Sequence, residues 1–393
     1  QTYFVAYYKV SSQYILLSEH KLLAGVIDLI LGDETMNWAL KNQKNKAIVW
    51  DYWQRMNNAQ PSEIKSICGR AFDKDVNWNG SQPFNQIIGV DKLISEFWEP
   101  LLKAFPDIQR IPHILLGGMS ANEEWVSGYG YLSGTFVNDW LGIPATGKKT
   151  NINFGQFFVM RDEKIVESYV IFDILSVMKQ AGFQVLPPAL GQEGGKVLKP
   201  RENGILLTEQ DDLESRKTQQ LIEAMATSMG WYNRSRDMEN MDTMKHHHFW
   251  HSDFHWMGPT GIGSSHTIEE YKDFHQRPWV LGFGDRDLNE ESGGRFMGWY
   301  SEGQYGALGI WDSKYSLHNG EYQGIPATKK MMTLRDFDWY RREGDYLIQN
   351  WVPMDVIDLF LQMDVDLFDR MHRQNELRKQ GINWWDLPVN RFS

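Results

Sequence analysis

A five-residue motif occurs twice in this chain of 393 residues, and its spacing limits the possible folds more than any other feature. The motif Gly-Ile-Pro-Ala-Thr at 142–146 recurs at 324–328, and 324 − 142 = 182. The segment after each copy reads as a strand that stops at an aspartate, Asp173 or Asp355, and 355 − 173 is again 182. A spacing kept over about thirty residues predicts a duplicated module. The function should therefore lie in the interiors of two related modules.

Earlier in each copy the spacing is slightly shorter. Trp78-Asn79-Gly80 corresponds to Trp256-Met257-Gly258, and 256 − 78 = 178. A chain of this length fits two or three domains. We divide it into an N-terminal extension, a first module, a linker, a second module and a C-terminal tail, at residues 1–45, 46–182, 183–208, 209–366 and 367–393.

Composition excludes several classes of protein. The chain has 40 basic and 51 acidic residues and a net charge of −11, which argues against a nucleic-acid partner. Its single cysteine, Cys68, permits no intrachain disulfide and fits a cytoplasmic location. Charged residues interrupt the apolar run at 14–31, so we predict no membrane span. The 17 Trp, 16 Tyr and 20 Phe indicate large cores or aromatic-lined pockets.

Each copy reads as helices followed by a run of strands and a short final helix, which predicts an α+β fold. Pro61 is placed to begin a helix, and Gly32-Asp33 is expected to end an earlier one that starts at Glu19. Asp173 and Asp355 precede the final helices, so each can cap a helix N-terminus. A role for these two in chemistry is the alternative.

This order of segments resembles the SnoaL-like polyketide cyclase family, within the nuclear-transport-factor-2-like superfamily. The second copy carries most of the resemblance, and the first carries it mainly through Phe105-Pro106-Asp107 and 142–182. The matching stretches of the second copy are 256–263, His275-Gln276-Arg277-Pro278, 283–286, 324–328, Asp338-Trp339 and Asn350-Trp351-Val352. The resemblance implies two tandem cone-shaped modules, each a strongly curved mixed β-sheet wrapped around helices, with an apolar pocket at one end. It also implies pairing through the open sheet face, hence a homodimer, and chemistry without metal or cofactor.

The resemblance also locates the catalytic positions of these cyclases. There, an aspartate on the last long strand acts as acid and base in an intramolecular aldol condensation, helped by a histidine on the strand before it. Alignment on the final helix places the aspartate at Val170 and Val352, and the histidine at Gln156 and Asp338. Valine cannot transfer a proton, so the cyclase mechanism does not carry over intact. The first copy is therefore not expected to be catalytic.

Asp338 is the candidate general base, because a carboxylate among aromatic residues on a pocket-facing strand is desolvated and its pKa is raised. His275 is its candidate helper, since it stands where the first copy has Phe97. The expected substrate contacts are Trp256, Trp339, Tyr340, Trp351 and Gln156. The alternatives are that Asp338 pairs with a neighbouring arginine and that His275 is a core histidine.

Five histidines lie between residues 246 and 255. On a helix, His247, His251 and His255 would share one face and could bind a metal. Structural or pocket-lining histidines are the other interpretations, and we expect no metal and no cofactor.

The leading hypothesis is a protein related to SnoaL-like polyketide cyclases that performs cofactor-free acid/base chemistry of cyclase, isomerase or hydrolase type. Its substrate would be a small hydrophobic organic molecule in the second module. The alternatives are a non-catalytic carrier or sensor of small molecules and a structural dimerisation module.

Overall fold

The computed structural model describes residues 20–57, 59–193, 200, 203–235, 241–284 and 293–382. The chain divides into two compact units, 1–41 and 42–393, and each is described by itself. Helix α1 (His20–Met56) begins in the first unit and ends in the second. The expected stop at Gly32-Asp33 is wrong, because one glycine inside a helix costs only about 1 kcal/mol relative to alanine. In the described part of the chain, no helix is long and apolar enough to cross a membrane.

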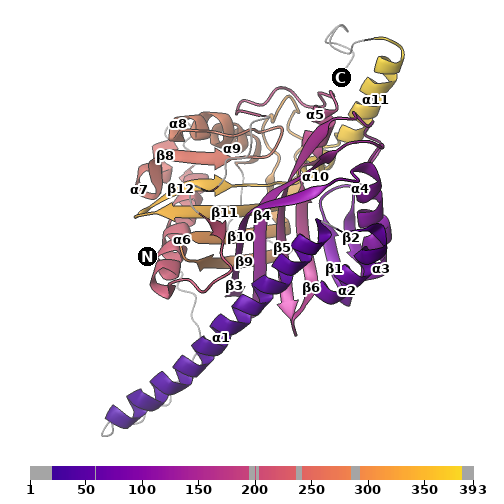
Figure 1. Ribbon diagram of the computed structural model, residues 1–393. Coiled ribbons are helices and arrows are strands. Elements are labelled where there is room, and N and C mark those ends of the chain that lie inside the picture. Colours follow the sequence, from indigo (N-terminus) through magenta and orange to yellow (C-terminus); the bar gives the residue numbers. More distant parts are fainter. Residues whose placement is uncertain are drawn as a thin grey trace. The chain divides into compact units, whose positions relative to one another are not determined.

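The first module combines short helices with a seven-stranded sheet in the order β2-β1-β6-β5-β4-β3-β7 (Figure 1). Its strands are β1 (Phe72–Gly80), β2 (Asn85–Ile88), β3 (Gln109–Ser120), β4 (Glu123–Thr135), β5 (Lys149–Arg161), β6 (Lys164–Phe172) and β7 (Gly204–Ile205). Its helices, besides the end of α1, are η1 (Pro61–Glu63), α2 (Ile64–Ala71), α3 (Val90–Leu93), η2 (Ile94–Trp98), α4 (Glu99–Ala104) and α5 (Ile174–Gln180). Pro61 begins η1, as predicted.

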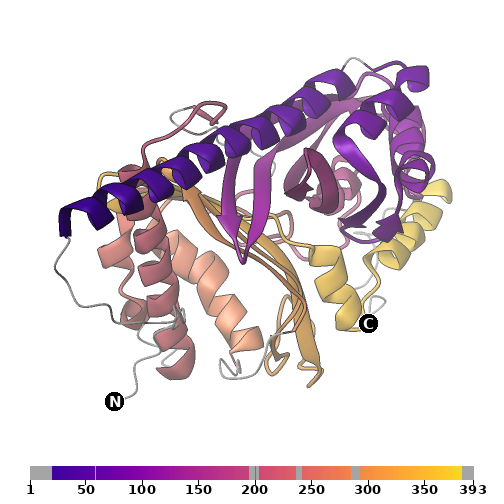
Figure 2. The ribbon, with the colours of Figure 1, turned by 90° about the horizontal axis from the view of Figure 1, so that it is seen from below.

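The second module has a five-stranded sheet in the order β8-β12-β11-β10-β9. Its strands are β8 (Trp250–Met257), β9 (Arg295–Glu302), β10 (Tyr305–Leu317), β11 (Met331–Glu343) and β12 (Tyr346–Trp351). Its helices are α6 (Asp212–Ser235), η3 (Met241–Met244), α7 (His246–Phe249), α8 (Ile268–Tyr271), η4 (Lys272–Gln276), α9 (Arg277–Phe283) and α10 (Val356–Gln362). Figure 2 shows the orange sheet curving around the pink and salmon helices of this module. The tail contributes α11 (Leu367–Lys379).

The two sheets agree in strand order and in register. Five strands of the first sheet, β1-β6-β5-β4-β3, correspond to β8-β12-β11-β10-β9 of the second. Trp78 lies beside Ser168 in the first sheet, and Trp256 lies beside Asn350 in the second. The offsets are 256 − 78 = 178 and 350 − 168 = 182, the same two that the motifs gave. The predicted fold class, two α+β modules each built on a mixed sheet, is confirmed.

Helices cover one face of each sheet, and the other faces pack against each other. The core between the sheets contains Phe157 and Tyr129 from the first module and Phe337, Trp339 and Trp351 from the second. The Phe157 and Trp339 rings have centroids 5.1 Å apart. These two residues occupy equivalent positions, because 339 − 157 = 182. The sheet face through which we expected two chains to pair is therefore covered within one chain.

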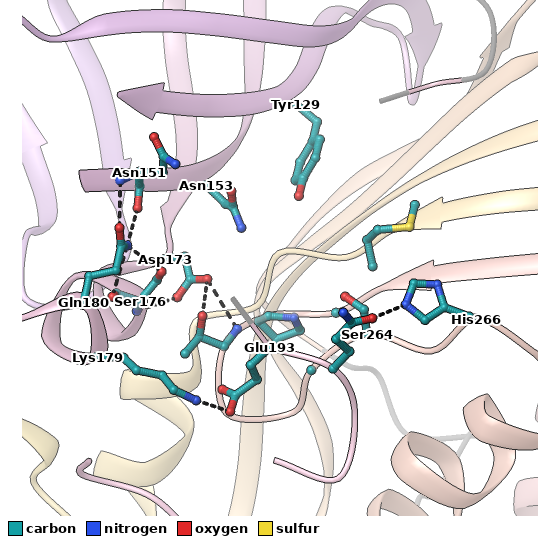
Figure 3. Close-up of a pocket in the computed structure, with 16 residues that line it drawn as sticks. Tyr129, Asn151, Asn153, Asp173, Ser176, Lys179, Gln180, Glu193, Ser264 and His266 are labelled. Atoms are coloured by element: carbon teal, nitrogen blue, oxygen red, sulfur yellow. Dashed lines mark hydrogen bonds and ion pairs between the residues drawn. The ribbon is translucent and has the colours of Figure 1, made fainter. Parts of the chain in front are cut away.

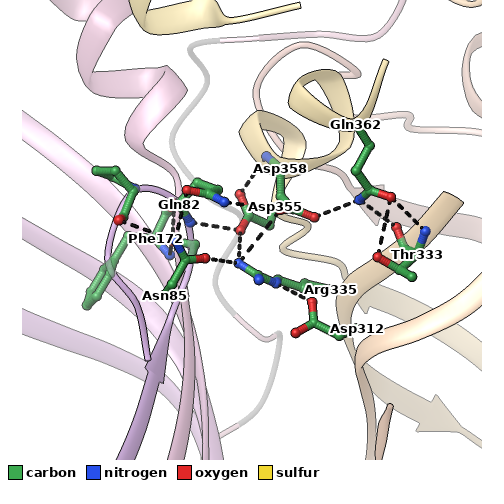
Figure 4. Close-up of polar contacts among 11 residues, drawn as sticks. Gln82, Asn85, Phe172, Asp312, Thr333, Arg335, Asp355, Asp358 and Gln362 are labelled. Atoms are coloured by element: carbon green, nitrogen blue, oxygen red, sulfur yellow. Dashed lines mark hydrogen bonds and ion pairs between the residues drawn. The ribbon is translucent and has the colours of Figure 1, made fainter. Parts of the chain in front are cut away.

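The two predicted N-caps are confirmed, and each also contacts the other module. Asp173 accepts from Ser176 N at 3.0 Å and from Thr260 Oγ1 at 2.7 Å. Asp355 accepts from Asp358 N at 3.2 Å and from Gln82 N at 2.8 Å (Figures 3 and 4). The offset 260 − 82 is 178, so equivalent residues make the two contacts. Each aspartate stabilises a helix and a module junction with one carboxylate.

Replacing Asp173 with alanine should lower the free energy of unfolding by more than loss of a cap alone, which costs about 1 kcal/mol. The matched control is Asp366→Ala, because Asp366 caps α11 through Phe368 N and Asp369 N. Urea unfolding followed by circular dichroism measures both variants. An equal loss in the two would contradict a stabilising contact at the junction.

Candidate functional site

The inward face of β11 carries two aspartates and a tyrosine. Side chains alternate along a strand, so Asp336, Asp338 and Tyr340 point to the same side. Tyr340 belongs to the helix-covered core, whereas Phe337 and Trp339 belong to the core between the sheets. The carboxylates therefore lie inside the second module, where both remain partly accessible.

Asp338 is held by its neighbours. Asn350 Nδ2 on β12 donates to Asp338 Oδ1 at 2.9 Å, and the Tyr340 hydroxyl is a second hydrogen-bond partner. Desolvation raises the pKa of Asp338 to about 6, although these two hydrogen bonds act in the opposite direction. A carboxylate with this pKa is ionised at neutral pH and is still basic enough to accept a proton.

Asp336 is the partner that the sequence analysis missed. Its Oδ1 is buried and accepts no hydrogen bond from the described residues. Desolvation, and then the charge of Asp338, raise the pKa of Asp336 well above its ordinary value. Because two nearby carboxylates repel each other when both are charged, they lose their protons in separate steps, so the site can hold one acid and one base.

His275 lies in η4, a π-helical turn at the position of η2 in the first module, since 272 − 94 = 178. Its ring stacks on Trp256 with centroids 4.1 Å apart. Trp256 is the β-sheet neighbour of Asn350, which binds Asp338. Burial lowers the pKa of His275 to about 3, so the imidazole is neutral at physiological pH. Its buried Nδ1 has no hydrogen-bond partner among the described residues.

Two of the expected substrate contacts lie elsewhere. Trp339 and Trp351 belong to the core between the sheets, and Trp339 Nε1 donates to Ser127 Oγ of the first module at 3.2 Å. Their placement in one pocket with Asp338 is wrong, because adjacent residues of a strand point to opposite faces. Trp339 is adjacent to Asp338, and Trp351 is adjacent to Asn350, whose side chain binds Asp338. Trp256 and Tyr340 do lie on the same side as Asp338.

Gln156 occupies, in the first module, the position of Asp338. It pairs with Val170 across β5 and β6, and its Nε2 donates to Ser168 Oγ at 3.0 Å. Ser168 stands where the second module has Asn350. Gln156 is therefore in the interior of the other module and cannot contact a ligand bound beside Asp338.

The histidine run does not form the helical face that we considered. Only His246–Phe249 are helical, as α7, and the residues from Trp250 continue as strand β8. His246 Nε2 lies 2.6 Å from Gln276 Oε1, and His255 Nδ1 lies 3.0 Å from His266 Nδ1. Among the described residues, no three His, Cys, Asp or Glu side chains are grouped to hold a metal ion.

Two cavities lie where the modules meet. One of about 400 Å³ is lined by Asp173, Lys179 and Glu193, among others (Figure 3). Lys179 pairs with Glu193, and Asp173 has the partners given above. The other, of about 540 Å³, contains Arg335, which binds Asp312 Oδ1 at 2.7 Å (Figure 4). The charged groups of both cavities are already paired, which favours a structural role at the junction.

Comparison with known proteins finds a family match within the first module. Residues 51–181 match the model of the family described as SnoaL-like polyketide cyclase. We expected the second copy to carry the resemblance, but the matched residues lie in the first. The search of curated proteins finds no match.

Several solved structures are similar to about a third of the chain. One is described as a SnoaL-like polyketide cyclase from Jannaschia sp. CCS1, with 17% identity and a TM-score of 0.32, covering 36% of this chain and 94% of that one. AclR from Streptomyces galilaeus, described as a hydroxylase, has 17% identity and a TM-score of 0.31, covering 36% and 97%. IdmH from Streptomyces antibioticus, described as a polyketide cyclase, has 16% identity and a TM-score of 0.30, covering 35% and 99%.

Proposed function

We propose that this chain, in which residues 51–181 match the SnoaL-like polyketide cyclase family, is a cofactor-free acid/base enzyme acting on a small hydrophobic carbonyl compound. The active site would be the interior of the second module. The observation that carries this proposal is the pair Asp336 and Asp338, two carboxylates on the same face of β11 whose pKa values are both raised by desolvation. Such pairs supply an acid and a base at the same pH.

The geometry supports proton abstraction next to a carbonyl group. Asp338 takes a proton from the carbon beside the carbonyl, and the protonated Asp336 donates a hydrogen bond to the carbonyl oxygen, where negative charge develops. The resulting enolate regains a proton from the now protonated Asp338 at another carbon in an isomerisation, or attacks a second carbonyl in a cyclisation. Asn350 and Tyr340 orient Asp338, and Trp256 and the neutral His275 contribute a flat wall.

A carrier or sensor is the second candidate function. The unpartnered Oδ1 of Asp336 supports it, because a buried acceptor without a donor can be satisfied by a ligand hydroxyl. Turnover separates the two candidates, since a carrier binds its ligand without exchanging the ligand's protons.

The test is deuterium incorporation at C2 of α-tetralone in D₂O, followed by NMR. We expect wild type to accelerate exchange. The exchange rate with Asp338→Asn should be lower than that with wild type by a factor of about 10² to 10⁴, the usual contribution of a general base. The rate should fall as pH drops through about 6, the pKa of Asp338. The control is Asp345→Asn, since Asp345 is exposed in the β11–β12 turn.

Exchange that survives in Asp338→Asn would refute its role as base. If wild type binds α-tetralone in a thermal-shift assay but does not exchange its protons, the carrier function is favoured instead.

Further parts of the proposal concern partners and location. We infer a cytoplasmic protein that acts on small organic molecules and binds no nucleic acid. Because the outer faces of the two sheets cover each other, a homodimer would have to form through a different surface. Sedimentation velocity would measure the oligomeric state.

A further inference from the structure

An arginine side chain is buried inside the first module, and no acidic residue in the described part of the chain pairs with it. Arg110 on β3 is 5% exposed. Its single side-chain hydrogen bond to the described residues runs from Nη1 to Gln156 Oε1, at 3.4 Å. Burial lowers its pKa to about 10, and no carboxylate opposes this. The guanidinium is therefore charged at neutral pH and has no carboxylate partner among the residues that the structure describes.

The surroundings leave one edge of this guanidinium free. The rings of Phe154 and Trp53 lie against it, with centroids 4.2 and 5.0 Å from Cζ. Nη1 is directed to Gln156, whose own amide is held by Ser168. Nε and Nη2 remain without acceptors among the described residues. This edge is the one that binds a carboxylate through two parallel hydrogen bonds.

The energetics favour an anion at this position. A buried, unpaired charge costs several kcal/mol. A cation–π contact with an aromatic ring recovers about 2 kcal/mol when it is desolvated. The indole Nε1 of Trp53 is also buried without an acceptor. Arg110 and Trp53 thus supply hydrogen-bond donors to an interior that is short of acceptors.

We propose that the interior of the first module binds the carboxylate of a small aromatic acid on the Nε–Nη2 edge of Arg110. A carboxylate matches the planar fork of guanidinium, and the apolar side chains around Trp53 and Phe154 would pack against an aromatic body. The interior of the second module carries acidic groups in place of a cation. Asp338 stands at the position equivalent to Gln156, and Asp336 lies on the same face of the strand. The two modules would therefore bind chemically different molecules.

The test compares 2-naphthoate with the neutral 2-naphthamide by isothermal titration calorimetry in low-chloride buffer. We expect saturable binding of 2-naphthoate and at least tenfold weaker binding of the amide. Arg110→Met keeps most of the side-chain volume and should weaken 2-naphthoate binding at least tenfold. Two controls should bind it like wild type: Arg161→Met, at the exposed end of β5, and Asp338→Asn, in the other module.

The Arg110→Met substitution should also affect thermal stability in the absence of ligand. Removing an unpaired buried charge should leave the melting temperature unchanged or raise it. If that variant does not fold, Arg110→Lys keeps the charge but loses the fork, and it should bind 2-naphthoate at least fivefold more weakly than wild type.

The proposal would be overturned by equal affinity for acid and amide, by unchanged affinity in the Arg110 variants, or by a thermal shift with sodium chloride alone that matches the shift with 2-naphthoate. None of them bears on proton exchange in the second module. Loss of 2-naphthoate binding in Asp338→Asn would instead place the acid in the second module and refute the site at Arg110.

Discussion

Replacing Trp339 with alanine should lower the free energy of unfolding by about 3–5 kcal/mol, the usual cost of deleting a buried tryptophan. The side chain is fully buried and contacts Phe157 of the first module at 5.1 Å between centroids. Its Nε1 also binds Ser127 Oγ of that module. The variant thus removes contacts that join the two sheets, and urea unfolding followed by circular dichroism measures the loss.

A matched substitution and a double-mutant cycle make this result specific. Trp299→Ala removes an indole from β9 that is only partly buried, so it should cost clearly less. Trp339→Ala and Phe157→Ala should show a coupling energy of about 0.5–1.5 kcal/mol, as aromatic pairs do. Additive losses, or equal losses for Trp299 and Trp339, would mean that contacts between the sheets do not contribute to stability.

The same residue shows where sequence reasoning failed. We placed Trp339 in one pocket with Asp338 because both lie in one aromatic segment. The alternation of a strand excludes that arrangement, and it also groups Asp336 with Asp338 and Tyr340. The signal for the missed carboxylate was therefore present in the sequence. Asp338 was the only carboxylate of this strand that we considered as a base.

Whether another feature could be predicted depended on how far apart in the sequence the contacting residues lie. The caps at Asp173 and Asp355 were predictable, because a cap is a contact between near neighbours. That each aspartate also binds the other module was not, since Thr260 and Gln82 are brought there by the packing of two sheets. Likewise, the duplicated spacing predicted two modules, but not that their open faces would cover each other. The unpaired charge of Arg110 could not be predicted either, because it depends on which of the described acidic residues the fold brings near it, and none of them pairs with it.

Asp338→Asn should stabilise the protein at high pH, although it removes the proposed catalytic base. The folded-state pKa of Asp338 is about 6, raised by desolvation from 3.8. In the unfolded chain this acid loses its proton near pH 3.8, whereas in the folded chain it keeps the proton up to about pH 6. Wild type therefore loses stability as pH rises through this window. The full cost is about 3 kcal/mol, at 1.36 kcal/mol per pKa unit.

Asparagine has no proton to lose, so its advantage should be about 3 kcal/mol at pH 8 and about 1 kcal/mol at pH 4.5. Urea unfolding of wild type and Asp338→Asn at the two pH values measures the difference. The exposed Asp345→Asn should show no such pH dependence. A gain that is the same at both pH values would mean that Asp338 titrates normally, and it would remove the basis for assigning it as the base. A gain that is about 2 kcal/mol larger at pH 8 than at pH 4.5, together with loss of proton exchange, is the result expected of a functional residue held at a cost to stability.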